Sequence, residues 1–249
     1  MPRARLLMAA VLLASPVSGQ PPLMEPRDFQ AIPSFPPDAT SRYGSDPDQF
    51  GDLRLPSGRG PHPVVILIHG DCFKSAYATL RDLAPIGDAL KREGIATWNI
   101  EYRRLGQPGG VWPGTYQDVG AAIDHLRSLA PRYRLDRRHV VVLGHSAGGH
   151  LAFWAAARDR VAAGSAIASR HPLRLTGAID LAGPLDLRDN INNCHTRCHD
   201  PVISQMMGGT PDQVRARRIV KRSDASLHAR YQPVHSRSEG SPEEPSRTV

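Results

Sequence analysis

Short aliphatic runs alternate with amphipathic helical patterns along most of the chain. The clearest run, Val64–Ile68, contains no polar residue, which is typical of a strand buried on both faces of a sheet. Other runs of aliphatic and aromatic residues, bounded by turn residues, indicate further strands. The predicted strands are 49–55, 63–69, 95–102, 139–143 and 175–181.

Helices are predicted between these strands. Leucine and isoleucine recur at three- and four-residue intervals over 78–93, and Gly94 is expected to end that helix. A second such pattern begins at Val119 and is expected to stop before Pro131, because proline lacks a backbone donor. A third helix is expected over 147–158. This alternation predicts an α/β fold, with a mostly parallel sheet covered by helices on both faces.

The two ends of the chain differ from this regular part. Arg3 and Arg5 precede an apolar run over 6–14, an arrangement that is typical of a secretory signal peptide. The predicted signal peptide comprises residues 1–19. The alternative, an uncleaved membrane anchor, is disfavoured because the run is too short to span a bilayer. We therefore expect export to the periplasm or the medium. Residues 20–40, rich in proline, are expected to form an extended lead-in.

Composition narrows the possible partners. The chain has 249 residues and a formal net charge of +7, and all but three of its 31 basic residues are arginines. The arginines are scattered and are not grouped with stacking aromatic residues, so nucleic acid is not an expected partner. No run reaches the roughly 18 to 20 apolar residues of a membrane-spanning helix. Nothing in the sequence indicates an oligomeric state.

The strongest chemical motif is Gly144-His145-Ser146-Ala147-Gly148, a G-x-S-x-G sequence between a predicted strand and a predicted helix. Glycines at its ends let strand and helix approach while the serine hydroxyl is exposed. Ser146 is therefore the candidate nucleophile. The alternative is a glycine-rich turn that happens to contain serine. His145 and the nearby His150 are expected to be structural rather than catalytic.

A second motif, Ile68-His69-Gly70-Asp71-Cys72, follows the first long buried strand. Backbone N–H groups of Gly70, Asp71 and Cys72 are expected to form an oxyanion hole together with the N–H of Ala147. Such donors stabilise the negative charge of a tetrahedral intermediate. His69 is expected to orient this loop.

Several stretches around these motifs resemble the α/β-hydrolase superfamily, in particular exported bacterial esterases and lipases similar to kynurenine formamidases and feruloyl-esterase-like domains. The stretches lie between about residues 40 and 215: QFGDLRLP, VVILIHGDCFKSAY, ATWNIEYRR, PGGVWPGTYQDVGAAIDHLR, VVVLGHSAGGHLAFWAA, IDLAGPLDL and MMGGTPDQV. The resemblance implies an α/β-hydrolase domain over 41–217. It also implies a small-molecule ester or related amide as substrate, with no cofactor.

The sequence departs from this family in two places. Asp71 stands where such proteins usually have glycine, so a carboxylate would oppose the charge of the transition state. The family's last strands, which carry its catalytic Asp and His, should follow MMGGTPDQV, yet apolar residues are sparse from Ser223 onwards. We expect a fold truncated after the strand at 175–181, with a disordered tail over 218–249, as a frameshift would produce. A non-catalytic relative is thus the alternative to a serine hydrolase.

A catalytic triad would need an acid and then a histidine downstream of Ser146. The acids in this order are Asp180, Asp186, Asp189, Asp200, Asp212 and Asp224. The histidines are His195, His199, His228 and His235. Asp186 follows a predicted strand and is the best acid, although it also fits a turn aspartate. Neither His228 nor His235 has a preceding strand to aim it, and neither is assigned as the base.

The chain has three cysteines, and export makes a disulfide between two of them reasonable. Cys194 and Cys198 lie in the cluster CHTRCH, which also raises the possibility of zinc or covalent haem. Their spacing fits neither, since haem attachment normally has two intervening residues and zinc ligand pairs are further apart. No metal is therefore assigned. The resemblance implies a disulfide from Cys72 to Cys194 or Cys198, which leaves one thiol over.

Overall fold

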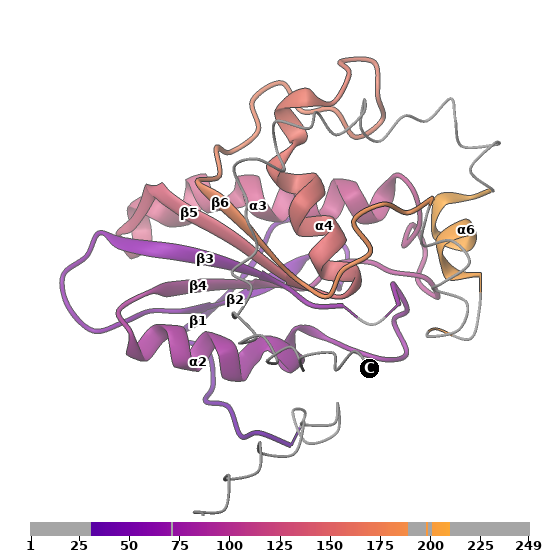
Figure 1. Ribbon diagram of the computed structural model, residues 1–249. Helices are drawn as coiled ribbons and strands as arrows, with labels where there is room; N and C mark the ends of the chain where they lie inside the picture. The colour runs from indigo at the N-terminus through magenta and orange to yellow at the C-terminus, as the bar shows by residue number, and fades with distance from the viewer. Residues whose placement is uncertain (1–30, 71, 189–197, 199–200, 210–249) are drawn as a thin grey trace, which may run out of the picture. The chain divides into compact units, whose positions relative to one another are not determined.

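The computed structural model describes residues 31–70, 72–188, 198 and 201–209. The structure divides after Ile32, and the fold given below is that of the unit beginning at Pro33. Its centre is a sheet with the strand order β1-β2-β4-β3-β5-β6 (Figure 1). Within the described residues no helix is both long enough and apolar enough to cross a membrane.

Four neighbouring strands of the sheet pair in parallel, and the two strands at one edge pair antiparallel. β1 pairs antiparallel with β2, and β2 pairs antiparallel with β4, whereas β4, β3, β5 and β6 run in the same direction. The strands are β1 (Ala39–Arg42), β2 (Phe50–Arg54), β3 (His62–Ile68), β4 (Ala96–Ile100), β5 (Leu135–His145) and β6 (Gly177–Leu181). The parallel strands end at the same edge of the sheet, where the loops carrying both sequence motifs begin.

Helices cover both faces of the sheet, as Figure 1 shows: α2 lies on one face, and α3 and α4 lie on the other. Two short 3-10 turns precede α2 and follow α4. The helical elements are η1 (Leu80–Leu83), α2 (Ala84–Arg92), α3 (Gly114–Tyr133), α4 (Ala147–Ala156), η2 (Arg158–Arg160) and α6 (Val202–Met207). This arrangement confirms the predicted α/β architecture.

Side chains of β3 alternate between two hydrophobic clusters. Ile66 packs in the larger cluster with α3 and α4, while Val65 and Leu67 pack in the smaller cluster that includes Leu83. This alternation explains why the run from Val64 to Ile68 contains no polar residue, because both faces of the strand are buried. Trp98 of β4 is fully buried and donates from Nε1 to the Ala122 carbonyl of α3 at 2.9 Å.

Several predicted boundaries were wrong. Strand β1 falls partly within the predicted lead-in, and α6 was not predicted. The helix predicted over 78–93 begins as the 3-10 turn η1. Helix α3 continues past Pro131, because proline lies in the last turn, buried Leu129 and Ala130 hold that turn, and Arg134 caps the helix in the left-handed conformation.

The sheet ends at β6 within the described residues. Ile179 and Leu181 of this strand expose 44% and 39% of their surface, whereas Ala178 on the other face is buried under α4. The smaller cluster around α2 includes partly buried Val141 and Leu143 of β5 but not β6. The truncation of the sheet after the strand at 175–181 stays a prediction. The predicted signal peptide over 1–19 and the predicted tail over 218–249 lie outside the described residues.

Candidate active site at the β5–α4 turn

Ser146 occupies the turn between β5 and α4, with φ 52° and ψ −120°. A positive φ is rare for a residue with a side chain, and such a conformation costs on the order of 1–3 kcal/mol. The side chain of Ser146 is partly exposed and makes no capping hydrogen bond to the helix. The serine hydroxyl is thus held at the sheet edge and is not used to stabilise α4.

Glycines on either side of Ser146 allow this tight turn. A Cβ atom at Gly144 would lie 2.0 Å from the carbonyl oxygen of Gly148. A Cβ atom at Gly148 would lie 2.1 Å from the carbonyl oxygen of Ile68, at the end of β3. Neither contact is possible for a real side chain, so both positions require glycine. The G-x-S-x-G spacing therefore brings α4 against β5 and β3.

The loop that follows β3 reaches the same point. A Cβ atom at Gly70 would lie 2.4 Å from the His145 carbonyl oxygen and 2.9 Å from the Cβ of Ser146. Cys72 and Phe73 both have positive φ, 55° and 56°. Asp71 lies outside the described residues. The structure thus brings Gly70 of the predicted oxyanion loop to the turn that carries Ser146.

A disulfide fastens this loop to a distant segment. Cys72 is bonded to Cys198, with a Cα–Cα distance of 5.8 Å and a sequence separation of 126. The predicted disulfide is confirmed, with Cys198 rather than Cys194 as the partner. Cys198 is therefore not available as a thiolate ligand for a metal. Cys194, His195 and His199 lie outside the described residues.

A buried network of charged side chains holds the loop that contains Gly70. His69 donates from Nε2 to Glu101 at 2.9 Å, and Arg104 forms an ion pair with Glu101 at 2.9 Å. Glu101 also accepts the backbone N–H of Leu80, at the far end of the loop, at 3.1 Å. The Tyr102 hydroxyl donates to the His69 carbonyl at 2.7 Å. The expected structural role of His69 therefore agrees with its contacts.

Electrostatics keep Glu101 ionised. Burial alone would raise its pKa, but the hydrogen bond and charge of His69, the charge of Arg104 and the backbone N–H of Tyr102 hold the pKa below its usual value. One carboxylate thus binds both ends of the loop that contains Gly70. Sequence reasoning missed Glu101 and Arg104, although both follow a strand whose end meets the site.

His150 is a structural histidine on α4, as expected. Its Nδ1–H donates to the Pro184 carbonyl at 3.0 Å, and its Nε2 accepts from the Tyr116 hydroxyl at 2.9 Å. Desolvation lowers the pKa of His150 to about 4, so the ring is neutral at pH 7. Both ring nitrogens are occupied, and His150 therefore fixes the loop after β6 against α3. His145 is exposed.

The candidate acids and bases are only partly described. Asp186 is exposed and accepts the backbone N–H of Arg188 at 2.8 Å, which is the bond of a turn aspartate. Asp180 accepts the backbone N–H of Gly183 at 2.7 Å. Among the described residues no histidine forms a hydrogen bond with the Ser146 hydroxyl. The remaining candidates lie outside them: Asp189, Asp200, Asp212, Asp224, His195, His199, His228 and His235.

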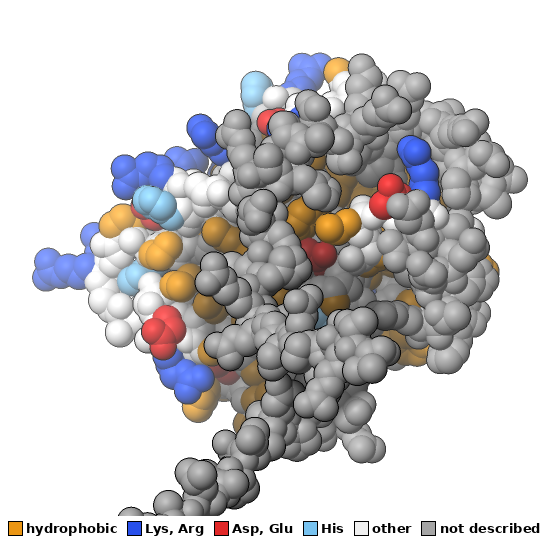
Figure 2. All heavy atoms as spheres, in the orientation of Figure 1, with side chains coloured by type: hydrophobic (Ala, Val, Ile, Leu, Met, Phe, Trp, Pro, Cys, Tyr) orange, Lys and Arg blue, Asp and Glu red, His pale blue; other side chains and the backbone are white. Residues whose placement is uncertain are grey.

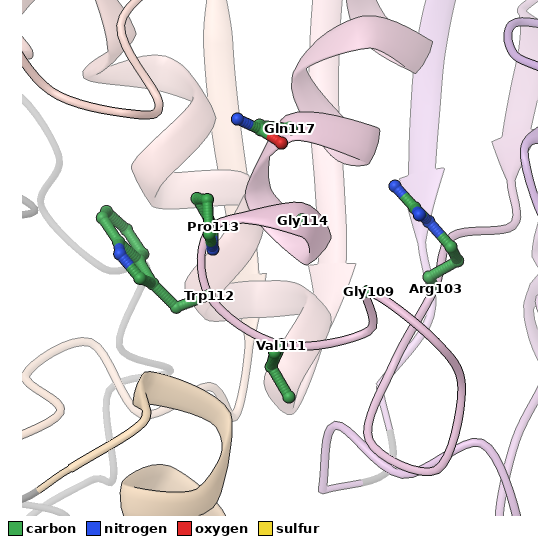
Figure 3. A pocket seen from close by; sticks show the side chains of 7 residues that line it. All are labelled: Arg103, Gly109, Val111, Trp112, Pro113, Gly114 and Gln117. Carbon is green, nitrogen blue, oxygen red and sulfur yellow. The ribbon is translucent and has the colours of Figure 1, made fainter.

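A small hollow lies at the beginning of α3. It has a volume of about 240 Å³ and is lined by residues that include Arg103, Val111, Trp112 and Gln117 (Figure 3). The ring of Trp112 packs edge-on against Tyr116 at 5.3 Å between centroids, and Tyr116 in turn bonds His150. The hollow is therefore connected to α4 through two aromatic contacts, and it does not include Ser146.

Known proteins that this chain resembles include an esterase and a kynurenine formamidase. It is 32% identical over 111 residues to the esterase LipC of Mycobacterium tuberculosis. That alignment covers 44% of this chain and 27% of LipC. It is 32% identical over 145 residues to the kynurenine formamidase avaC of Aspergillus versicolor, covering 53% of this chain and 47% of avaC. The chain thus matches less than half the length of either relative.

Solved structures show the same fold. Esterase B from Lactobacillus rhamnosis superposes with a TM-score of 0.62 at 22% identity, over 78% of this chain and 64% of that protein. The family model BD-FAE matches residues 52–228, which is more than half of the chain and includes both the Gly70 loop and the Ser146 turn. The chain therefore belongs to the BD-FAE family and has the α/β-hydrolase fold.

Proposed function

We propose that this protein is a serine hydrolase of carboxylic esters or related amides, with Ser146 as the nucleophile. One observation carries the proposal. The Ser146 side chain lies on a strained turn directly against the Gly70 backbone. The proposed nucleophile and the proposed loop of backbone donors are therefore neighbours at the edge of the sheet where the parallel strands end. Membership of an esterase-rich group of relatives supports the same reaction class.

The proposed reaction proceeds through an acyl-enzyme. The Ser146 oxygen attacks the acyl carbon of the substrate, and the carbonyl oxygen becomes an oxyanion. That oxyanion is proposed to accept hydrogen bonds from the backbone N–H groups of Gly70, Asp71, Cys72 and Ala147. The first N–H groups of a helix have no partner within the helix, which suits Ala147 for this role. The alcohol or amine then leaves, and water releases the acid and regenerates Ser146.

Removal of the Ser146 proton needs a base, which the described histidines do not supply. The alternative proposal is therefore a non-catalytic relative that retains the nucleophile turn. The two proposals differ in the reactivity of Ser146, because a serine without a base is hardly activated. Export to an oxidising compartment is proposed for either case, and the Cys72–Cys198 disulfide supports it.

The deciding experiment combines a fluorophosphonate probe with hydrolysis of a short-chain nitrophenyl ester. We expect the probe to label the full chain and Ser57→Ala, which removes an exposed serine in a turn, but not Ser146→Ala. In an intact enzyme of this type, loss of the nucleophile costs roughly 10⁶-fold in turnover. Equal and marginal hydrolysis by all three proteins, without labelling, would establish the non-catalytic alternative.

A further inference from the structure

A basic hollow lies at the amino-terminal end of β5, the end of that strand opposite Ser146. Arg137, Arg138 and Arg174 line it together with Thr176, and its volume is about 290 Å³. Figure 2 shows lysine and arginine side chains gathered with histidines at the left of the molecule, where Figure 1 places the beginnings of β5 and β6. This surface plays no part in the proposed hydrolysis.

A bulge in β5 carries two of these arginines outward. The pairing of β3 with β5 passes from His62–Leu135 directly to Val64–Val140. The stretch of β5 between Leu135 and Val140 is therefore longer than the β3 stretch that faces it, and it must project from the ladder. Residues 137–139 are accordingly exposed.

Asp136 gives the bulge a fixed shape. One carboxylate oxygen accepts the backbone N–H of Arg138 at 2.9 Å and its Nε at 3.2 Å, and the other lies 2.9 Å from Nδ1 of His139. Hydrogen bonds from Arg138 and His139 hold the pKa of Asp136 below its usual value. The carboxylate is therefore ionised at neutral pH and keeps the bulge in place.

Positive charge is in excess around the hollow. Asp136 is engaged by Arg138 and His139, whereas within the described residues Arg137 and Arg174 form no ion pair. The Thr176 hydroxyl donates to the Val140 carbonyl at 2.9 Å, so its proton is not available to a ligand. The side-chain donors that face the hollow are thus guanidinium groups.

A guanidinium group presents a planar fork of donors that matches two oxygens of a phosphate or sulfate. We propose that the hollow formed by Arg137, Arg138 and Arg174 binds a phosphate- or sulfate-type oxyanion. The anion is either free or a group on an acidic polymer. At about 3.3 Å per strand residue the hollow is roughly 20 Å from Ser146, so an anion bound there does not contact the proposed nucleophile.

The test is isothermal titration of the full chain with sodium pyrophosphate and, separately, with dextran sulfate, at constant ionic strength. The double variant Arg137→Ala/Arg174→Ala removes two guanidinium groups from the hollow and leaves Arg138 bonded to Asp136. Arg59→Ala/Arg92→Ala removes two exposed arginines outside the hollow and is the control of equal charge. We expect the hollow variant to bind at least about tenfold more weakly than the control.

The two titrants distinguish the source of the oxyanion. Pyrophosphate binding that is lost in the hollow variant assigns a site for a small anion. Binding of dextran sulfate alone, lost in the same variant, assigns a site for an acidic polymer. Failure of both titrants to bind, or equal weakening in both double variants, overturns the proposal.

Discussion

The backbone N–H of Ser146 donates a 2.8 Å hydrogen bond to the carbonyl oxygen of Leu181. The turn that carries the proposed nucleophile is thereby tied to the end of β6, the edge strand of the described sheet. His150 makes a second tie, through Pro184 in the loop that follows β6. The position of Ser146 therefore depends on how firmly β6 is held.

Self-association through β6 is the first prediction. An apolar edge strand offers both unpaired backbone groups and hydrophobic side chains to another chain. Light scattering across a concentration series should show association of the full chain, and Ile179→Lys should reduce it. Tyr77→Lys, which changes an exposed aromatic residue outside the sheet, is the control. A monodisperse monomer at all concentrations would contradict the prediction.

Gly70→Ala should destabilise the protein, because its Cβ would meet the backbone carbonyl of His145. Overpacking of this kind costs roughly 1–3 kcal/mol, and it should also displace the loop from Ser146. Gly164→Ala is the matched control, since no atom lies within 4 Å of the added carbon. Urea denaturation gives both free energies of unfolding. Equal stability of the two variants would show that the loop and the turn do not make this close contact.

Glu101→Gln should lower the free energy of unfolding by about 3–5 kcal/mol, because it leaves buried Arg104 without its counter-charge. Asp38→Asn breaks the partly exposed pair with Lys91 and should cost less than about 1 kcal/mol. The same denaturation experiment compares them. A loss of similar size in both variants would mean that Glu101 does not hold the loop ends together.

One free thiol should be found when the denatured, non-reduced protein is titrated with a thiol reagent. Cys72 and Cys198 are bonded to each other, so the free thiol is Cys194. Cys194→Ala should give no free thiol and unchanged stability. Replacing both Cys72 and Cys198 by alanine should cost about 2–5 kcal/mol. Three free thiols in the unaltered protein would eliminate the disulfide.

Stability should fall between about pH 6.5 and pH 4 because of His150. The fold lowers the pKa of His150 to about 4, so the unfolded chain takes up a proton in this range before the folded chain does. The loss is at most about 3 kcal/mol. The free energy of unfolding, measured at pH 7 and at pH 4.5, should differ less in His150→Gln than in the unaltered protein.

His125 needs a parallel measurement, since burial also lowers its pKa and acts in the same direction. We expect His125→Gln to change the pH dependence less than His150→Gln, because His125 is partly exposed and His150 is buried. The reverse order would show that His150 is not the main group titrating in this range.

The buried strands and the Ser146 turn could be predicted because each has a local cause. An unbroken aliphatic run such as Val64–Ile68 has one explanation, and Gly144 is fixed by its close approach to the carbonyl oxygen of Gly148, four residues further along the chain. Glu101 could not be predicted as a site residue. Its role comes from contacts with His69 and Leu80, which only the parallel pairing of β3 and β4 brings near it.

Boundaries failed where tertiary contacts outweighed a local signal. Pro131 normally ends a helix, yet packing of the turn around it and a left-handed cap at Arg134 keep α3 helical. Strand β1 has no apolar pattern of its own and forms because β2 offers it an edge. The partner of Cys72 was open for a similar reason, since sequence spacing does not distinguish Cys194 from Cys198.

The separation of Cys72 and Cys198 also sets an order of events during synthesis. A chain that emerges amino-terminus first exposes β3 and the Gly70 loop long before residue 198. The strands up to β5 can pair during that interval, but the loop beside Ser146 cannot yet be cross-linked. Cross-linking of the loop beside the proposed nucleophile is therefore a late step, reached only after Cys198 has met Cys72.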